Sequence, residues 1–578
     1  MYVKTVLVSI IVFVLAVAPA WSQKPENILA AVGTPHNPKV QIVWNRYYDN
    51  TALADLYQQL QNAHPDLVQV ASVGKSFEER DIWVITVSDR TVGDPDRKPA
   101  MYIDGGIHAN EIQTSEFCLY TIWYLAEMHA AGNKFVRQLL AEKTFYIAPS
   151  INPDARDHFI HRANTQHSSR SGMIPVDNDR DGAYNEDDFD DLDGDGHIVM
   201  MRRKSPYGQF VPDTKDPRRM VRIAEGQQGE YELLGYEGID NDGDGLINED
   251  GEGAYDPNRD WGWNWQPNYV QRGAYKYPFS LPENRAVAEF IMSKPNIAAG
   301  QNYHNMGGMI LRGPGAQEDE GTYSRQDIAV YDELGRKGEQ IIPGYNYLVV
   351  YKDLYSVYGG QLDWMYAARG IFVFCNELWT SYLLNHRREH DDRQGEQYTF
   401  DQYLLMGDGF VDWKPFKHPH YGDVEIGGFK KTYGRLHPGF LLESDAHRNM
   451  AFTLYHAYNT PKLDVAEIDV QDLGGGLKEV TAVVTNSRLI PTHSSVDVQN
   501  RIEVPDVISL SGGDVLSGMV VDDRDLGLTT EQRNDPANIR VANIPGNSHV
   551  TVRWIVRGGN KFTVTVDSKK GGTDSKTM

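Results

Sequence analysis

A histidine and a glutamate three positions apart, His108 and Glu111, follow a short apolar segment ending at Ile103. On a turn, side chains with this spacing can reach one point, and imidazole nitrogen and carboxylate oxygen are both zinc ligands. A catalytic zinc needs only three protein ligands, and it lowers the pKa of a water bound at its fourth position. The pair alone is a weak indication, because a polar loop with a helix-capping glutamate has the same pattern.

Further segments carry side chains that suit a zinc-dependent hydrolase. A second histidine, His304, follows an apolar stretch, and Glu377 ends an apolar run that begins at Ile371. An amide and a guanidinium lie side by side on a loop at Asn258 and Arg259. The remaining elements are Asn152-Pro153-Asp154, Asp256 before the Asn-Arg pair, and Tyr355 ahead of Gly359-Gly360.

In this order and spacing the segments resemble the zinc carboxypeptidase family, of which carboxypeptidase A is the best-known member. The resemblance covers about residues 40–440. It implies a mixed, mostly parallel eight-stranded sheet with helices on both faces. It also implies hydrolysis of the C-terminal peptide bond by a zinc-activated water, so the expected partner is a peptide or protein with a free C-terminus.

The resemblance assigns a role to each matching residue. His108, Glu111 and His304 match the ligands of one zinc ion, and Glu377 matches the carboxylate that activates the water and then protonates the leaving amine.

The residues expected around the substrate are also implied by the resemblance. Asn258 and Arg259 match the pair that holds the terminal carboxylate, which a guanidinium fork can bind through two hydrogen bonds. Tyr355 matches the residue that closes over the substrate, and Asp256 matches a carboxylate that orients a ligand histidine.

Two further positions concern the oxyanion and the specificity pocket. The family has an arginine between the Asn-Pro-Asp segment and the Asn-Arg pair, and Arg203 aligns best with it, with Arg202 and Arg162 as alternatives. A cation there would stabilise developing negative charge. Leu362 stands where an aspartate would favour basic terminal residues, so we expect apolar or neutral ones.

Three acidic runs repeat the opening of a calcium-binding loop, with aspartates at alternate positions followed by glycine. A solvated acidic loop is the simpler interpretation of one such run, but three repeats favour structural calcium. The twelfth position is a carboxylate only in the first run, and no helices clearly flank the runs, so EF-hands are not predicted. The expected ligands are Asp177, Asp179, Asp181, Asp188, Asp191, Asp193, Asp195, Asp240, Asp242 and Asp244.

The sequence divides into a signal, a catalytic domain and an accessory domain. Apolar β-branched runs alternate with helical periods over residues 23–460, which predicts an α/β domain. Acidic insertions at about 165–203 and 219–254 interrupt it, and we expect something other than a hydrophobic core to hold them. Short alternating runs over 461–578 predict an all-β sandwich. In that domain we expect a hairpin around 550–566 and a frayed tail from Ser568.

The N-terminus predicts export. Lys4 precedes an apolar run that is too short to span a bilayer, and Ala20-Trp21-Ser22 resembles a signal-peptidase site, so residues 1–22 read as a cleaved signal peptide. We therefore expect a secreted or periplasmic protein, without a membrane span and most simply a monomer. In that setting Cys118 and Cys375 are either bonded or buried free thiols.

Composition excludes some classes of function. The chain has 578 residues, 40% of them hydrophobic, and a formal net charge of −24, so global disorder and phosphate-mediated nucleic-acid binding are disfavoured. Two rival functions stay open. One is a peptidoglycan peptidase or amide deacylase on the same scaffold. The other is a calcium-dependent binding protein with an inactive site, which a complete catalytic set argues against.

Overall fold

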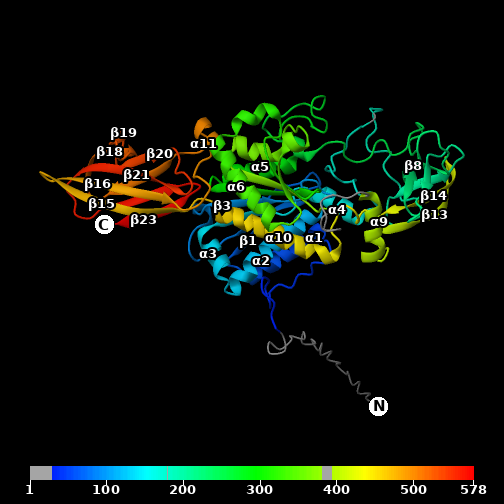
Figure 1. The fold of residues 1–578 in the computed structure, drawn as a ribbon, viewed down its shortest axis with the longest axis horizontal. Helices are drawn as coiled ribbons and strands as arrows, with labels where there is room; N and C mark the ends of the chain where they lie inside the picture. The colour runs from blue at the N-terminus through cyan, green and yellow to red at the C-terminus, as the bar shows by residue number, and fades with distance from the viewer. Residues whose placement is uncertain (1–28, 179, 381–392) are drawn as a thin grey trace, which may run out of the picture.

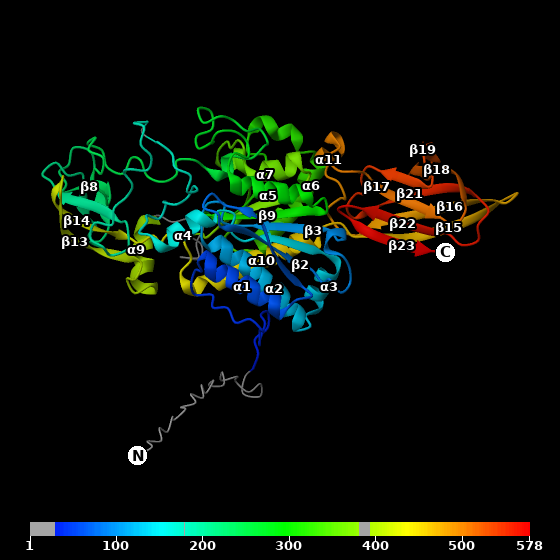
Figure 2. The ribbon, with the colours of Figure 1, turned by 180° about the vertical axis from the view of Figure 1, so that it is seen from behind.

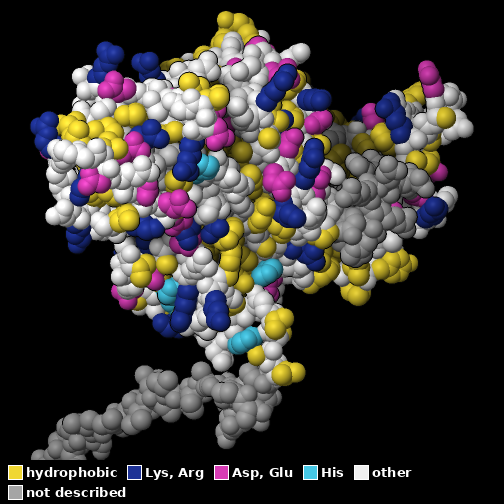
Figure 3. Space-filling model, turned by 60° about the vertical axis from the view of Figure 1, so that its left-hand side comes forward, with side chains coloured by type: hydrophobic (Ala, Val, Ile, Leu, Met, Phe, Trp, Pro, Cys, Tyr) yellow, Lys and Arg dark blue, Asp and Glu magenta, His cyan; other side chains and the backbone are white. Residues whose placement is uncertain are grey.

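The computed structural model describes residues 29–178, 180–380 and 393–578. A central α/β domain lies between a small β-rich lobe on one side and a β-sandwich on the other (Figures 1 and 2). The predicted signal peptide, residues 1–22, lies outside the described residues. Within them, no helix combines the length and apolarity needed to cross a membrane. On the face shown in Figure 3, acidic and basic side chains are interspersed.

The central domain is built on a mixed eight-stranded sheet with the order β1-β2-β4-β3-β9-β12-β10-β11. Its inner strands β4, β3, β9 and β12 run parallel, while β1, β2 and β10 introduce antiparallel pairs. The strands are β1 (Val68–Lys75), β2 (Asp81–Val87), β3 (Ala100–Asp104), β4 (Thr144–Ala148), β9 (Ile297–Asn305), β10 (Met309–Arg312), β11 (Asn346–Val349) and β12 (Phe372–Leu378).

Helices cover both faces of this sheet, which confirms the predicted fold class. In Figures 1 and 2, α1, α2, α3 and α10 lie on one face and α5 on the other, and α6 packs against α10 through Gly338 and Phe452. The helices are α1 (Asn50–Ala63), α2 (Gln113–Ala130), α3 (Lys134–Glu142), α4 (Pro153–His161), α5 (Pro282–Ser293), α6 (Arg325–Ile341), α7 (Gln361–Asp363), α9 (Arg393–Leu404), α10 (Gly439–Tyr458) and α11 (Ser495–Asn500). The shorter turns are η2 (Pro95–Arg97), η3 (Pro257–Arg259), η4 (Gln317–Thr322), η5 (Val350–Leu354) and η6 (Trp364–Ala368).

The innermost strands are buried along their whole length and end at one edge of the sheet. Every residue of β3 and β9 is buried, as expected for parallel strands covered on both faces. In the register of the sheet, Asp104 lies opposite Asn302, and His304 lies opposite Glu377. The carboxyl ends of β3, β9 and β12 therefore bring their terminal side chains together, where open α/β sheets place their sites.

The acidic insertions belong to a lobe with a sheet of its own, of order β13-β14-β5-β8-β6-β7. The lobe has a small hydrophobic core that includes Val199, Met201 and Ile426, so the expectation of insertions without a core is wrong for their strands. Residues after the catalytic motifs complete this sheet. Its strands are β5 (Met200–Lys204), β6 (Phe210–Pro212), β7 (Met220–Arg222), β8 (Tyr231–Tyr236), β13 (Phe410–His418) and β14 (Gly422–Phe429).

The C-terminal region forms two packed sheets, with the orders β15-β16-β21-β18-β19 and β20-β17-β22-β23. A core that includes Val480, Trp554 and Val564 fills the space between them. The strands are β15 (Leu463–Gly474), β16 (Leu477–Asn486), β17 (Asp506–Ser511), β18 (Asp514–Asp523), β19 (Leu528–Gln532), β20 (Asn538–Val541), β21 (Ser548–Arg557), β22 (Thr563–Ser568) and β23 (Gly572–Thr577).

Two local predictions for this domain are wrong. The turn after Arg557 does not close a hairpin, because β21 pairs with β16 and β18 whereas β22 pairs with β17 and β23 in the other sheet. The turn carries the chain from one sheet to the other. The expected frayed tail is the edge strand β23, whose backbone pairs with β22 from Gly572 to Thr577.

A buried ionic cluster fastens the sandwich to the catalytic domain. His493 contacts Asp497 through Nδ1 at 3.0 Å and Asp506 through Nε2 at 3.3 Å. Lys570 donates to Asp497 at 2.8 Å and to the carbonyls of Arg369 and Gly370 at 3.2 Å each. Because Gly370 precedes β12, the cluster holds the segment that leads into a central strand of the sheet.

We predict that this junction weakens at alkaline pH. Burial opposes a charged imidazole, but the hydrogen bonds to Asp497 and Asp506 outweigh it and raise the pKa of His493 to about 9. A raised pKa contributes stability below the unfolded value of about 6.5, and that contribution is lost as pH rises through about 9. The melting temperature should fall between pH 6.5 and 9.5 in the parent, and less steeply in His493→Gln. Equal slopes in the two proteins would contradict this account.

Candidate metal centre

The loop between β3 and α2 presents His108 and Glu111. Gly106 turns the chain with φ of 68°, a left-handed conformation that favours glycine, and its N–H donates to Thr114 Oγ1 at 2.8 Å. Thr114 Oγ1 in turn donates to the carbonyl of Glu111 at 2.7 Å. The first turn of α2 therefore fixes the loop that carries His108 and Glu111. The side chains of these two residues are each 2% exposed.

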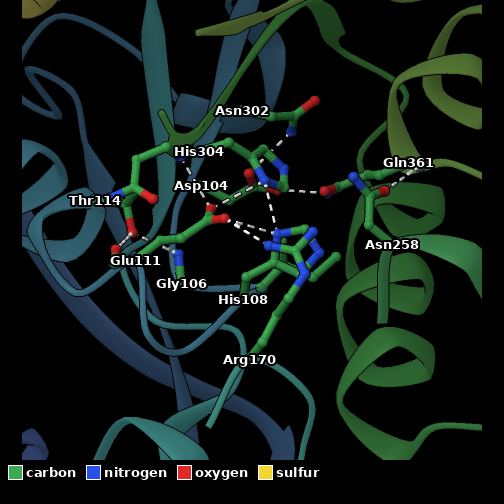
Figure 4. A network of polar contacts seen from close by, with 12 residues as sticks. Asp104, Gly106, His108, Glu111, Thr114, Arg170, Asn258, Asn302, His304 and Gln361 are labelled. Atoms are coloured by element: carbon green, nitrogen blue, oxygen red, sulfur yellow. Dashed lines mark hydrogen bonds and ion pairs between the residues drawn. The ribbon is translucent and has the colours of Figure 1, made fainter. Parts of the chain in front are cut away.

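His108, Glu111 and His304 converge on one point (Figure 4). His108 Nδ1 lies 3.1 Å from Glu111 Oε1 and 3.1 Å from His304 Nδ1, and His304 Nδ1 lies 3.2 Å from Glu111 Oε2. Two ring nitrogens facing a carboxylate at these distances form the nitrogen and oxygen donor set that zinc prefers. The three buried residues therefore fit one zinc ion.

Asp256 determines which nitrogen of His108 is free to act as a ligand. His108 Nε2 donates to Asp256 Oδ1 at 2.9 Å, so the lone pair of the neutral ring lies on Nδ1, towards Glu111 and His304. Burial disfavours the charge of Asp256, but His108, Arg259 and Arg170 hold the pKa of this carboxyl well below its usual range. The predicted orienting role of Asp256 agrees with this geometry.

Glu377 lies on β12, in register with His304 on the neighbouring strand β9. Burial and the nearby Glu111 raise the pKa of Glu377 to about 7, while His304, Arg170 and Arg435 act in the opposite direction. A carboxyl group with a pKa near neutrality can both accept and return a proton. Its position beside the metal donors suits the role predicted from the sequence.

Asn258 and Arg259 lie in η3, which directly follows Asp256 in the chain. Asp256 Oδ1 accepts from Asn258 N at 2.7 Å, and Asn258 Oδ1 accepts from Gln361 N at 2.9 Å. Gly359, with φ of 66°, approaches Arg259 so closely that a Cβ atom would lie 2.7 Å from the Arg259 carbonyl oxygen. Gly359 thus allows the loop before α7 to pack on the Asn-Arg pair.

One cavity joins these groups to an apolar pocket. His108, His304, Glu377, Asn258 and Arg259 line it together with the apolar side chains of Leu311, Val350, Leu354, Val357, Leu362 and Cys375. The ring of Tyr355 also lines the cavity and is 59% exposed, so it can move over a bound molecule. Cys375 and Cys118 are both buried and unbonded, which decides between the two expectations for the cysteines.

The structure corrects the expected position of the oxyanion arginine. Arg203 lies on β5 of the lobe, pairs with Glu232 at 2.9 Å and does not line the cavity. Arg202, one alternative, pairs with Glu425 in the same sheet. Besides Arg259, the cavity is lined by Arg170, which donates to Glu111 Oε1 at 2.9 Å. Arg170 was not predicted from the sequence, although it lies where the family order places an arginine, between Asp154 and Asn258.

A second arginine, Arg435, also lies beside the metal donors and was not predicted. Its Nη2 donates to the carbonyl and side-chain oxygens of Asn305 at 3.0 and 2.9 Å and lies 3.8 Å from Glu111 Oε1. Asn305 N donates to Glu111 Oε2 at 3.0 Å. Arg435 comes from the segment that returns from β14, and no sequence motif marks it.

The structure gathers some of the expected calcium ligands and not others. Asp240, Asp242 and Asp244 have carboxylate oxygens within 4.8 Å of one another, as do Asp191 and Asp193 with Glu237. Asp181 is grouped with Glu186 and Asp242. The described clusters do not include Asp177, Asp188 or Asp195, and Asp179 lies outside the described residues.

Comparisons with known proteins agree on one family. The family model described as zinc carboxypeptidase matches residues 53–204 and 237–391, and a model of a domain of unknown function matches 462–578. Carboxypeptidase B2 of Mus musculus is 33% identical over 115 residues, which cover 20% of this chain and 26% of that protein. A zinc carboxypeptidase of Saccharothrix mutabilis subsp. capreolus is 34% identical over 97 residues, covering 17% and 22%. These matches span about a quarter of the relatives' length.

Two solved structures match this chain at low sequence identity. Carboxypeptidase A from Helicoverpa armigera has a TM-score of 0.43 and 16% identity, covering 73% of this chain and 75% of the other. Thrombin activatable fibrinolysis inhibitor has a TM-score of 0.42 and 16% identity, covering 72% and 74%.

We predict that Asp256→Asn weakens zinc binding by about 10–100-fold, because the amide no longer fixes the His108 tautomer. Competition with a fluorescent zinc chelator would measure the dissociation constant. Asp472→Asn, an exposed change of the same kind in the sandwich, serves as the matched control. Equal affinities in the Asp256→Asn variant and the parent would show that Asp256 does not orient His108.

Proposed function

The chain belongs to the zinc carboxypeptidase family, and on that premise we propose that it is a zinc metallocarboxypeptidase that removes the C-terminal residue of peptides or proteins. The observation that carries the proposal is one cavity that is lined by the zinc donors His108 and His304, by Glu377 and by the pair Asn258 and Arg259. A carboxypeptidase needs the zinc donors, the proton-transferring glutamate and the carboxylate-binding pair within the length of one substrate residue. Only the carboxylate-binding pair distinguishes a free terminal carboxylate from other substrates.

Asn258 and Arg259 would hold the terminal carboxylate of the substrate. Arg259 is 8% exposed, and its buried Nε has no hydrogen-bond partner among the described residues. Its Nη1 donates to the Asn258 carbonyl at 2.7 Å, which orients the guanidinium plane. A carboxylate supplies the two acceptors that such a fork lacks, so binding the substrate would satisfy a buried donor.

Glu377 would move the protons of the reaction. When bound by His108, Glu111 and His304, zinc would polarise the scissile carbonyl and lower the pKa of a water at the open position. Glu377, beside His304, would accept the proton of that water and return it to the leaving amine. Its pKa of about 7 keeps both protonation states accessible near neutrality.

Arg170 would stabilise the charge that develops on the carbonyl oxygen. It lines the cavity and is held in place by Glu111 and by Asp256, whose Oδ2 lies 3.5 Å from its Nη2. A guanidinium that is already fixed in place stabilises an oxyanion without having to reorganise during the reaction. The arginine is thus positioned by two carboxylates that also serve the metal donors.

The pocket favours an apolar terminal side chain. Leu311, Val350, Val357, Leu362 and Cys375 form one small apolar cluster in its wall. Asp363 also lines the cavity and accepts from Gly315 N at 2.9 and 3.1 Å, and burial raises the pKa of this carboxyl to about 7. A basic side chain would therefore meet mainly apolar surface.

We propose that the protein is exported, on the evidence of the apolar run and cleavage signal in residues 1–22, and that the acidic loops bind structural calcium. A peptidoglycan peptidase with the same zinc site is the rival that the cavity leaves open, because short cell-wall peptides can also carry a free carboxylate. The binding-protein alternative is disfavoured by the complete set of zinc donors and Glu377.

The proposed reaction is tested with blocked dipeptides and the variant Glu377→Gln. We expect the parent to release the terminal amino acid and the variant to lose activity by about 10²–10⁴-fold while it retains zinc. A zinc chelator should abolish the activity of the parent. Failure of the zinc-loaded parent to release any terminal residue would contradict the proposal, and testing it on cell-wall peptides would then examine the rival function.

A second prediction distinguishes Arg170 from Arg203. Arg170→Ala should lower kcat by about 10²–10³-fold, because it removes a group that stabilises the oxyanion. Arg203→Ala, which breaks a surface pair with Glu232, should leave kcat unchanged and serves as the control. The reverse result in steady-state kinetics would restore the alignment made from the sequence.

A third prediction concerns the terminal residue. Leu362→Asp should shift the preference from apolar to basic terminal residues, and kcat/KM for a terminal leucine or phenylalanine should fall by about tenfold or more. Leu362→Asn introduces a side chain with nearly the shape of aspartate but without its charge. This variant therefore separates the effect of charge from the effect of size. If both variants keep the preference of the parent, Leu362 does not set specificity.

A further inference from the structure

Two acidic segments of the lobe are copies of one another. Residues 177–187 read DNDRDGAYNED and residues 240–250 read DNDGDGLINED, so eight of the eleven positions are identical. We call these segments copy 1 and copy 2. The shared pattern extends past the aspartates to a closing Asn-Glu-Asp, which the third acidic run, from Asp191, lacks.

The two copies fold in the same way. In copy 1, Asp177 accepts from Arg180 N at 2.6 Å and from Gly182 N at 3.2 Å. In copy 2, the corresponding Asp240 accepts from Gly243 N at 2.5 Å and from Gly245 N at 3.0 Å. These bonds make tight loops in which the first aspartate is used by the backbone, and they leave the closing residues free to interact elsewhere.

The closing residues of each copy bind the other copy. Asp187 and Asp250, the last residues of the two copies, form an antiparallel bridge and are fully buried. Asp250 accepts from Asn178 N of copy 1 at 2.7 Å. In return, Asp187 accepts from Asn241 Nδ2 of copy 2 at 3.2 Å. The copies are therefore interlocked as a reciprocal pair, and neither is an independent loop.

The interlocked pair contains carboxylates without a partner. Glu186 and Glu249 are half-buried residues whose carboxylate oxygens are covered by neighbouring atoms, and none of these oxygens accepts a hydrogen bond from the described residues. Glu186 faces Asp250 and Glu249 faces Asp187, so each places like charge against the buried aspartate of the other copy. Shielded carboxylates that face one another without a donor are costly unless a cation lies between them.

We propose that copy 1 and copy 2 together form a shared Ca²⁺-binding centre, with ligands drawn from both copies. One set of oxygens comes from Asp181, Glu186 and Asp242, and a second comes from Asp187, Asp242 and Glu249. Asp242 belongs to both sets, and each set includes residues of both copies. All donors are carboxylates, the hard oxygen ligands that calcium prefers, and zinc would instead favour imidazole or thiolate.

The shared centre is connected to the catalytic cavity by two short stems. Copy 1 begins shortly after Arg170, and copy 2 ends shortly before Asp256, Asn258 and Arg259. The stems lie side by side, since Ser171 Oγ donates to the Tyr255 carbonyl and Ile174 N donates to the Tyr255 hydroxyl at 3.1 Å. Calcium that clamps the copies would thus hold Arg170 and the Asn-Arg pair at a fixed separation. This consequence rests on the proposed function, whereas calcium binding does not.

The experiment measures calcium binding to full-length, zinc-loaded protein freed of calcium with a chelator selective for calcium over zinc. Titration calorimetry and thermal melts would be run on the parent, Glu186→Gln, Glu249→Gln and the control Glu467→Gln. Glu467 is an exposed glutamate on β15 in the sandwich. We expect calcium to raise the melting temperature of the parent and of the control equally. Glu186→Gln and Glu249→Gln should each bind calcium more weakly than the parent at every site of the shared centre, by about tenfold or more.

The result of each single variant tests the sharing. In independent loops, Glu186→Gln would remove the calcium of copy 1 and leave copy 2 at parental affinity, and that outcome would overturn the shared centre. The absence of calcium binding by the parent would overturn the site itself, and this arm needs no variant to fold. Peptidase assays with and without calcium form a separate arm. A parent that binds calcium but lacks peptidase activity contradicts the proposed function and leaves the shared centre standing.

Discussion

The arrangement of the site depends on two imidazole nitrogens that face each other 3.1 Å apart beside a carboxylate. Neutral rings in this position direct lone pairs into the same space, which is unfavourable without a cation. Asp256 makes the arrangement persist, because it holds His108 in the tautomer that leaves Nδ1 free. The neighbouring arginines, Arg170 and Arg435, then balance the carboxylates that surround the donors.

The sheet supplies the rigidity that such a centre needs. His304 and Glu377 end neighbouring parallel strands in register, so their separation is fixed by backbone hydrogen bonds. His108 and Glu111 follow the next strand, β3, and are fixed by the first turn of α2. Substrate-binding residues lie on loops instead, which suits groups that must respond to a ligand. The lobe and the sandwich each attach close to these elements, through Tyr255 and through Gly370.

The sequence identified the residues whose spacing is local or set by strand ends. The donors and Glu377 come together because each lies at or shortly after the end of a buried apolar run, a feature visible in the sequence. Arg170 was missed because the acidic insertion after it obscured the spacing, and Arg203 offered a closer match to the family segment. Arg203 lies in the lobe because its strand, β5, pairs with β8 and β14, whose residues are distant in the sequence.

Errors in the sandwich and in the acidic loops have the same physical origin. The turn after Arg557 has the composition of a hairpin turn, but the composition of a turn does not determine which sheet the next strand joins. The polar residues of β23 resemble a tail because an edge strand is stabilised by backbone pairing and not by burial. The repeated aspartates of the acidic runs were evident in the sequence. The contact between Asp187 of copy 1 and Asp250 of copy 2 is visible only in three dimensions.

X-ray absorption at the zinc edge, on protein loaded with one zinc per chain, tests the central claim most directly. The account predicts two imidazole nitrogens at about 2.0–2.1 Å and carboxylate oxygen, with no sulfur, and a spectrum that changes when His304 is replaced by alanine. Zinc with sulfur neighbours, or a spectrum unaltered in His304→Ala, would place the metal elsewhere and contradict the account.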